Sequence, residues 1–330
     1  MEIVFATSDL YSKPAMVTIK TLFENNKNSK SINLHYIGNG LSLKNKNLLQ
    51  KLAKEYQRKI TFYEMPNYLN NVSGLLRTNA IAYTYCYFQD ILPSNVEKVL
   101  LLESDTIVTD SLEEFYNTNI TDYYLAATDD LQSKYCKEKI GMKATTPYFN
   151  SGVMLLNLSK MRDDHISEKI TPIIQSGKAK FLYEVQDEMN YLLAEKVKIL
   201  PPKFNCTTAI FLFKYDDMRR YRWPSTCCSR KEYEEARNHP VVVHFTKNQI
   251  IQARPWVKEC THPYNDYYLK YKAGSPASDM ELWESNRKTV NKIVYFIYSR
   301  LSEGVLARIL GIVHAYLYPK FLYKYILRGK

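Results

Sequence analysis

The amino-terminal third of the chain alternates short apolar runs with longer segments whose apolar residues recur at helical spacing. Consecutive or alternating apolar residues predict β-strands, and apolar residues three or four positions apart predict amphipathic helices. The predicted strands cover residues 2–6, 32–38, 59–65 and 98–105, and the predicted helices cover 14–26, 43–56 and 78–92. Because strands alternate with helices, the pattern predicts βαβ units and a mostly parallel sheet.

The fourth predicted strand carries two carboxylates at its carboxyl end. In the stretch VLLLESDTIVTD, residues 99–110, Glu103 and Asp105 follow a run of consecutive apolar residues. Such a run is typical of a strand that is buried on both faces, and open parallel sheets bind ligands just beyond the carboxyl ends of their strands. A turn there can bring both carboxylates to one divalent cation, and hard carboxylate oxygens suit Mg²⁺ or Mn²⁺.

Two other interpretations of this stretch stay open. Asp110 and Ser111 precede LEEFY and can start a helix, although this explains neither Glu103 nor Asp105. An apolar strand followed by acid-x-Asp-Thr also occurs in haloacid-dehalogenase-like phosphatases, in which an aspartate is the nucleophile. Here the first acid is a glutamate, and the motif lies about a third of the way along the chain rather than near its start.

Composition limits the class of protein. With 330 residues, 45% of them hydrophobic and 13% aromatic, the chain can bury one large core or two modest ones. Six cysteines without CxxC spacing predict neither a zinc ribbon nor a disulfide framework. No glycine-rich phosphate loop of the GxGxxG or GxxxxGK type occurs. A phosphate-bearing ligand therefore needs another binding group, which a bound metal can provide. The chain opens on a predicted strand, and we expect no secretory signal and a cytoplasmic protein.

Positive charge is concentrated towards the carboxyl terminus. Residues 286–330 carry nine Lys or Arg against the single acid Glu303, within a net charge of +11 for the whole chain. The segment is also rich in aliphatic and aromatic residues, but its longest uncharged run, 309–319, is shorter than the roughly 20 residues of a membrane span. This pattern is typical of a helix that lies in anionic headgroups, so we expect peripheral attachment to the inner face of the membrane. A helix packed on the body of the protein is the alternative, and no nucleic-acid partner is expected because no recognition module is visible.

Five separated segments together resemble glycosyltransferase family 8, the retaining enzymes that include glycogenin and bacterial lipopolysaccharide galactosyl- and glucosyltransferases. In chain order they are FATSDLY, LPSNVEKVLLLESD, YFNSGVMLLNL, VQDEMNYLL and VVVHFTKNQIIQARPW. The resemblance implies an α/β fold: one Rossmann-like nucleotide-sugar-binding domain of the GT-A type at 1–260, with a mixed, mostly parallel sheet, and a helical, membrane-associating extension at 261–330. It also implies transfer of a hexose from a UDP-sugar, with retention, to a glycan or lipid-linked acceptor in cell-surface polysaccharide or lipopolysaccharide synthesis.

The resemblance further implies roles for individual residues. Glu103, Asp105 and His244 would coordinate Mn²⁺, with Mg²⁺ as the alternative, and Gln186 and Asp130 would lie at the catalytic centre. Because Gln186 is a neutral amide, we expect transfer on the front face without a covalent glycosyl-enzyme. The residues that would bind the UDP-sugar are Ala6, Thr7, Ser8, Asp9, Tyr11, Ser104, Asn150, Lys247 and Arg254.

Several positions depart from the family pattern. Glu103 replaces the more usual aspartate, and Ser8 replaces a frequent acid of the first turn. Tyr85 stands where a donor-contacting arginine is expected, and Val185 replaces the acid that leads the Asp-Gln-Asp run. These departures leave the donor sugar open, and they leave a catalytically weakened, membrane-associated nucleotide-sugar-binding protein as an alternative. The segment 205–237 suits either a lid on the acceptor side or an ordinary surface excursion.

Overall fold

The main sheet of the protein has seven strands in the order β3-β2-β1-β4-β7-β6-β8. The computed structural model describes residues 1–69, 80–176, 181, 183–248, 250–285, 293, 295–296 and 300–322. The strands of this sheet are β1 (Glu2–Ser8), β2 (Asn33–Asn39), β3 (Lys59–Glu64), β4 (Lys98–Leu102), β6 (Leu125–Asp129), β7 (Phe149–Asn157) and β8 (Val197–Leu200). Only β7 runs antiparallel to its neighbours, β4 and β6, so the predicted mixed, mostly parallel sheet is confirmed.

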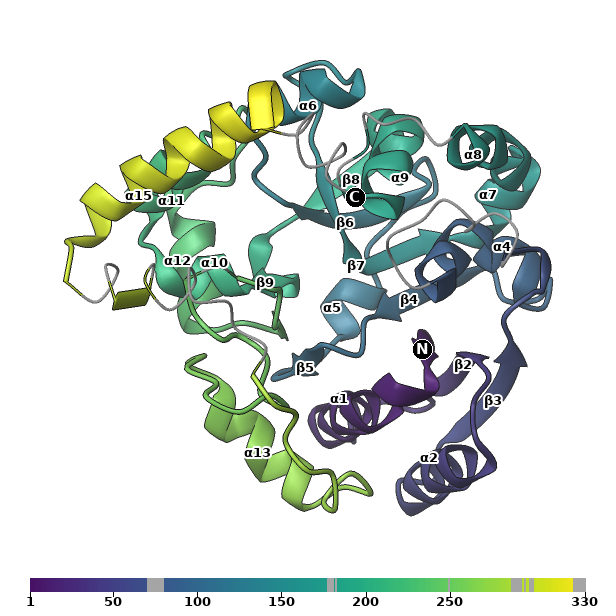
Figure 1. Ribbon diagram of the computed structural model, residues 1–330. Helices are drawn as coiled ribbons and strands as arrows, with labels where there is room; N and C mark the ends of the chain where they lie inside the picture. The colour runs from purple at the N-terminus through teal and green to yellow at the C-terminus, as the bar shows by residue number, and fades with distance from the viewer. Residues whose placement is uncertain are drawn as a thin grey trace.

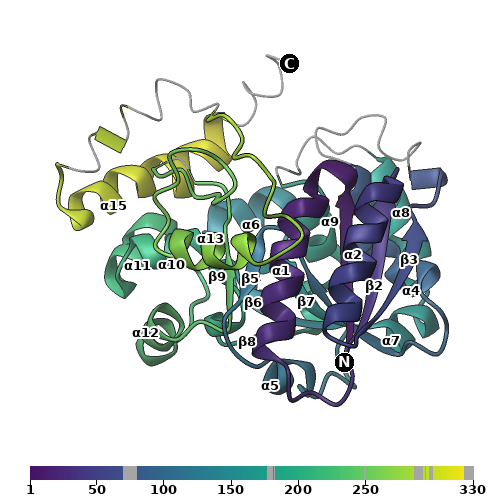
Figure 2. The ribbon, with the colours of Figure 1, turned by 90° about the horizontal axis from the view of Figure 1, so that it is seen from below.

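Helices cover both faces of this sheet (Figures 1 and 2). Alternate residues of β1 enter two separate cores: Ile3 and Phe5 pack on the side of α1, α2 and α13, whereas Val4 and Ala6 pack on the side of α4 and α7 to α9. The residues of β4 from Val99 to Leu102 are all fully buried, as the sequence predicts. The covering helices are α1 (Ser12–Asn25), α2 (Leu43–Glu55), α4 (Phe88–Ile91), α7 (Leu158–Asp163), α8 (Ile166–Gln175), α9 (Val185–Leu193) and α13 (Asn265–Ala273).

The helix predicted over 78–92 is wrong in type. Residues Ala80–Tyr87 form a 3₁₀ helix, η2, and only α4 is α-helical, while 78 and 79 lie outside the described residues. Tyr83 to Tyr87 are five consecutive buried side chains, and η2 packs against β1, α8 and α9. Because aromatic residues have modest helix propensity, tertiary packing decides the conformation of this segment.

A second, three-stranded sheet brings the late part of the chain to the end of β4. After a turn at Ser104 and Asp105 the chain continues as β5 (Thr106–Val108). Strand β5 pairs antiparallel with β10 (Val242–His244), which runs parallel to β9 (Cys206–Thr207). In this register His244 lies opposite Thr106, so the sheet places a histidine beside the two carboxylates.

The carboxyl-terminal helix packs back onto the body. Helix α15 (Glu303–Gly311) continues as a π-helix, η5 (Ile312–Leu322), and together they lie along α11 (Tyr215–Arg222) and reach α6 (Lys134–Ile140), as the yellow ribbon in Figure 1 shows. Leu306 and Ala307 join a third core formed with α10 (Thr208–Leu212), α11 and α12 (Arg230–Asn238). A Cβ on Gly311 would lie 2.1 Å from the backbone oxygen of Arg220, so this close approach needs a glycine.

The remaining short elements connect the parts already named. They are η1 (Asp9–Tyr11), α5 (Glu113–Tyr116), η3 (Ala194–Lys196) and η4 (Pro202–Phe204). No helix in the described part of the chain has the length and apolar character needed to cross a bilayer. Of the basic segment 286–330 that was expected to contact the membrane, residues 286–292, 294, 297–299 and 323–330 lie outside the described residues.

Candidate active site

Two carboxylates and one imidazole converge at the carboxyl end of β4. The Nε2 atom of His244 lies 3.3 Å from Glu103 Oε2 and 3.3 Å from Asp105 Oδ1. One ligand atom from each of the three side chains lies within 4.8 Å of the other two, and no other such group occurs in the part of the chain that the structure describes. Two oxygens and one nitrogen at this separation form a donor set that suits Mn²⁺ or Mg²⁺, so the residues fit the metal that the family resemblance implies.

A glycine on β7 makes room for this triad. A Cβ on Gly152 would lie 2.4 Å from Glu103 Oε2 and 2.4 Å from His244 Cε1. The backbone oxygen of Gly152 also accepts a hydrogen bond of 3.0 Å from the Glu103 amide, which fixes the chain directly after β4. The glycine of the FNSG motif is therefore required by the close packing of the triad.

A chain of amide side chains orients His244. Its Nδ1 donates to Asn205 Oδ1 at 3.0 Å, and Asn205 Nδ2 donates to Asn150 Oδ1 at 2.9 Å. Because Nδ1 is held in this way, Nε2 faces the two carboxylates. A hydrogen bond to the second ring nitrogen is the usual support of a metal-binding histidine.

Electrostatics in the triad favour ionised side chains. Burial alone would lower the pKa of His244, but the charge of Asp105 and the hydrogen bonds to Asp105 and Glu103 raise it to about 10. Burial acts in the opposite sense on Asp105, yet His244 and Arg254 hold its pKa below the usual range. Without a metal, a proton on His244 thus offsets part of the negative charge of the site, and a divalent cation can take its place.

Arg254 connects the triad to the first turn of the chain. Its Nη2 lies 3.3 Å from Asp105 Oδ2, and its Nη1 donates to the hydroxyl of Tyr11 at 3.3 Å. Tyr11 in turn packs edge-on against Trp256 and Trp283. Arg254 thus places a cation beside Asp105 and links the triad to Tyr11.

A second polar group lies in the same cleft, centred on Asp130 and Gln186. Gln186 Nε2 donates to Asp130 Oδ2 at 3.3 Å, and Gln132 donates to the same oxygen at 2.9 Å. Gln186 Oε1 accepts from the Ser151 amide at 3.0 Å, so both ends of this amide are held. The cleft has a volume of about 720 Å³ and includes both this group and the triad of Glu103, Asp105 and His244. This size is typical of a small-molecule site.

The predicted donor-binding residues divide into two sets. Asn150, Lys247 and Arg254 line the cleft, and Tyr11 contacts Arg254. The others do not line the cleft, but β1 pairs parallel with β4, so the carboxyl ends of these two strands lie at the same edge of the sheet. The members of this second set are Ala6, Thr7, Ser8, Asp9 and Ser104.

Contacts within the protein occupy two side chains of that second set. The hydroxyl of Thr7 lies 2.6 Å from the hydroxyl of Tyr36 in the interior. Asp9 Oδ1 accepts from the Ser42 amide at 2.8 Å and holds the start of α2. The roles assigned to these residues stay predictions.

Comparison with known proteins identifies the family. The model of the family described as glycosyl transferase family 8 matches residues 2–260. The chain belongs to glycosyltransferase family 8. It is therefore a glycosyltransferase, and the interpretation as a haloacid-dehalogenase-like phosphatase is wrong.

Two related proteins match most of the chain. General stress protein A of Bacillus subtilis (strain 168) is 26% identical over 275 residues, which is 82% of this chain and 92% of that protein. The lipopolysaccharide 1,2-glucosyltransferase of Escherichia coli is 30% identical over 300 residues, which is 86% of this chain and 81% of that protein.

Solved structures show the same fold. The galactosyltransferase LgtC in complex with donor and acceptor sugar analogs has a TM-score of 0.70 and 24% identity, over 83% of this chain and 96% of that one. The bifunctional glycosyltransferase WbbM in its apo form has a TM-score of 0.69 and 17% identity, over 85% of this chain and 51% of that one. The fold of this family 8 protein is thus the GT-A type that the resemblance implies.

One departure of this family 8 chain has a visible structural counterpart. The hydroxyl of Tyr85, which stands where an arginine is expected, donates to Glu103 Oε1 at 2.9 Å. Burial and the charge of Glu103 raise the pKa of Tyr85 well above the usual value, so the hydroxyl stays a donor. Tyr85 therefore fixes the longer arm of Glu103 and leaves Oε2 to face His244.

Sequence reasoning missed several residues of this site. Asn205 orients His244, and Arg222 and His314 line the cleft. Asn205 and Arg222 lie in the segment 205–237, for which a lid on the acceptor side was one interpretation, but neither was given a role. Arg222 belongs to α11 and His314 to η5, so long-range packing brings them to the cleft. Gly152 stands in the quoted YFNSGVMLLNL segment, but its packing role was not predicted.

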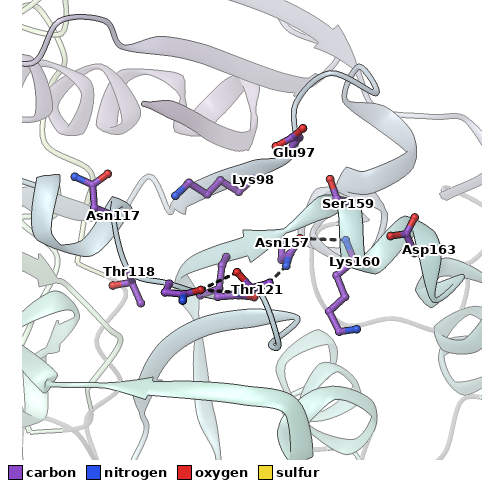
Figure 3. Close-up of a pocket in the computed structure, with 11 residues that line it drawn as sticks. Glu97, Lys98, Asn117, Thr118, Thr121, Asn157, Ser159, Lys160 and Asp163 are labelled. Carbon is purple, nitrogen blue, oxygen red and sulfur yellow. Dashed lines mark hydrogen bonds between the residues drawn. The ribbon is translucent and has the colours of Figure 1, made fainter.

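A second cavity, of about 490 Å³, lies at the opposite end of β4 (Figure 3). It is lined by polar residues around Lys98 and Asn157, which stand at the start of β4 and the end of β7. Asn157 accepts from the Lys160 amide at 3.0 Å and donates to the Ile120 oxygen at 3.0 Å. The hydrogen bonds of Asn157 cap and connect local elements.

Proposed function

We propose that this protein is a metal-dependent, retaining hexosyltransferase that moves a sugar from a UDP-sugar to a glycan or glycolipid acceptor. The observation that carries the proposal is the triad of Glu103, Asp105 and His244, which lies at the carboxyl end of β4 in the large cleft. Bound there, Mn²⁺ or Mg²⁺ would supply positive charge to the diphosphate of the donor. Similarity to lipopolysaccharide glycosyltransferases supports cell-surface glycan synthesis as the context.

Two basic side chains would act on the diphosphate of the donor together with the metal. Arg254 lies against Asp105, and Lys247 lines the cleft nearby. When the bond to the sugar breaks, negative charge develops on the departing UDP, and preorganised cations stabilise it. Tyr11 keeps Arg254 in place through its hydroxyl and offers a ring to the uracil.

Gln186 and Asp130 then organise the side of the cleft that receives the sugar. The oxygens of Asp130 already accept from Gln132, Gln186 and Asn150, so they are held rather than free to attack. Gln186 is a neutral amide and a poor nucleophile. This arrangement supports transfer on the front face, in which the incoming hydroxyl approaches on the side from which UDP leaves. Detection of a covalent glycosyl adduct on any side chain would contradict this mechanism.

Calorimetric titration with UDP tests the metal-dependent donor site directly. We expect UDP to bind the wild-type protein in the presence of Mn²⁺, with an affinity at least about tenfold lower when Asp105→Asn removes a metal ligand. Asp110→Asn is the matched control, because Asp110 is an exposed acid of the same stretch. Equal affinity in the wild type and in Asp105→Asn would contradict the proposed site.

We further propose residues 1–260 as the catalytic unit and 261–330 as a peripheral membrane anchor at the inner face. An exposed apolar strip on the carboxyl-terminal helix supports attachment, because interfacial helices bury such a strip among the lipids. The residues of this apolar strip are Val305, Ile309, Ile312, Val313 and Phe321. The basic residues of 286–330 suit anionic headgroups.

A further inference from the structure

The carboxyl-terminal extension contributes a side chain to the active-site cleft. His314 of η5 lines the cleft that contains the metal triad, although it lies beyond residues 2–260, which match the family. Its ring meets the ring of Tyr221 edge-on, with centroids 5.6 Å apart. The hydroxyl of Ser133, at the start of α6, donates to the Ala315 oxygen at 2.7 Å and fixes η5 at this position. The extension is therefore a wall of the cleft.

Arg222 lies beside His314 in the same wall and has unused hydrogen-bond donors. Its side chain is only 20% exposed, and its nearest acidic atom is Asp130 Oδ1, at 3.9 Å. With the residues that the structure describes, Arg222 makes no hydrogen bond. A guanidinium carries five N–H donors, and leaving them unpaired after most of their hydration is lost is costly. An oxygen-rich ligand in the cleft would satisfy them.

The charges around Arg222 indicate which ligand this is. Asp130 already balances the charge of the guanidinium, so directional donors, and not net charge, remain available to a ligand. The pKa of His314 is lowered to about 4, by burial and then by the charge of Arg222, so its ring is neutral. Tyr183 also lines the cleft and is 42% exposed, which offers a flat face to a sugar ring. Neutral hydroxyl groups suit this environment better than an acid.

We propose that Arg222 and His314, beside Asp130, form the acceptor subsite and bind the hydroxyl groups of a neutral sugar, with one wall supplied by the carboxyl-terminal helix. The proposal rests on the glycosyltransferase function proposed above. It assigns to the extension a part in acceptor recognition, in addition to membrane attachment. A truncation at residue 286 would accordingly remove part of the acceptor subsite along with the anchor.

The test separates the donor side from the acceptor side of the cleft. UDP release from the UDP-sugar into water, without acceptor, reports on the donor side. Transfer of radiolabelled sugar into a glycolipid fraction, extracted with detergent from cells that naturally produce this protein, reports on both sides. The detergent removes any effect of membrane attachment. The variants are Arg222→Lys and His314→Ala. Their controls are Arg219→Lys, an exposed arginine of the same helix α11, and Val313→Ala, the exposed neighbour of His314.

We expect Arg222→Lys and His314→Ala to raise the KM for the glycolipid fraction about tenfold, because directional hydrogen bonds to hydroxyl groups are lost. UDP release without acceptor should stay within about twofold of the wild type, since the donor side is intact. Both controls should match the wild type. His314→Gln, which restores a hydrogen-bonding side chain, should recover part of the loss. The KM of the wild type should be the same at low and high salt, because the ligand is neutral.

Other outcomes overturn the proposal in distinguishable ways. A parallel fall in UDP release and transfer would show that Arg222 and His314 support the donor side. Unchanged transfer in both variants would show that they do not touch the acceptor, and a KM that rises with salt would indicate an anionic acceptor. If the wild type releases UDP without labelling the glycolipids, the acceptor class is wrong. Absence of UDP release in the wild type would contradict the proposed function itself, and the subsite proposal would fall with it.

Discussion

The backbone of β7 passes so close to Glu103 and His244 that only glycine fits at position 152. We expect Gly152→Ala to lower the Mn²⁺ affinity at least about tenfold, because the new methyl group displaces two of the metal ligands. Gly274→Ala is the matched control, since a Cβ there comes closest to the flexible end of Lys20, at 3.3 Å, and lies in ordinary contact distance of the Tyr271 oxygen, at 4.0 Å. Titration with Mn²⁺ measures the effect, and wild-type affinity in Gly152→Ala would show that the triad does not hold the metal.

Tyr85 illustrates why single departures from a family pattern are difficult to interpret from sequence. The loss of an arginine and the change of an aspartate to Glu103 look like two independent losses. In the structure the two new residues contact each other, because Tyr85 donates to Glu103 Oε1. Each position alone predicts a weakened site, whereas the pair fixes one carboxylate oxygen and leaves the other towards His244.

Helix α9 carries a buried acid whose titration affects the stability of the fold. Glu188 is 3% exposed, and its Oε2 has no hydrogen-bond partner. Burial, and then the charges of Asp187 and Glu184, raise its pKa from 4.5 to about 7. Because the folded state holds this proton more tightly than the unfolded state, the stabilising contribution is complete below about pH 4.5 and is lost as the pH rises to about 7.

Glu188→Gln should therefore stabilise the protein at pH 8 and have little effect at pH 4. The expected gain at pH 8 is on the order of 3 kcal/mol in the free energy of unfolding, as follows from the size of the pKa shift. Urea unfolding at the two pH values measures it, with the exposed Glu195→Gln as the control. An equal effect of Glu188→Gln at both pH values would show that its ionisation is not the cause.

Local patterns predicted most elements of the amino-terminal half, because each strand and helix there carries its own periodicity. The exception is η2, whose five consecutive buried residues follow tertiary packing instead. The candidate site was harder to predict from the sequence. The acid pair could be located at a strand end, but the contact with His244 depends on the pairing of β5 with β10. The position of His314 depends on the close approach at Gly311, which no local pattern reveals.

At the scale of the whole molecule, the positions of basic residues and of exposed apolar side chains lead to a prediction about membrane attachment. We expect the protein to sediment with vesicles that contain phosphatidylglycerol, and the double variant Ile309→Ser, Ile312→Ser to lose this binding, because two side chains of the apolar strip no longer enter the lipid. Leu43→Ser is the control, since Leu43 is 73% exposed on α2. Unchanged sedimentation of the double variant would contradict attachment through the apolar strip.

The arrangement of the molecule also explains how attachment and chemistry can be combined. The carboxyl-terminal helix presents the apolar strip to the outside and packs Leu306, Ala307 and Gly311 against α11 and its surroundings. The same segment places His314 in the lining of the cleft. A membrane surface at the apolar strip would thus lie close to the wall of the cleft, and a lipid-linked acceptor would have a short path to the proposed subsite.

The central claim, that the triad supports metal-dependent transfer from a UDP-sugar, is tested most directly by UDP release. A panel of UDP-sugars is offered to the wild type with Mn²⁺ or with a chelator, and to Asp105→Ala with Mn²⁺. We expect release from one donor in the wild type with Mn²⁺, and no release with the chelator or in Asp105→Ala. Metal-dependent UDP binding without release from any donor would contradict it, and would favour the alternative of a nucleotide-sugar-binding protein that has lost turnover.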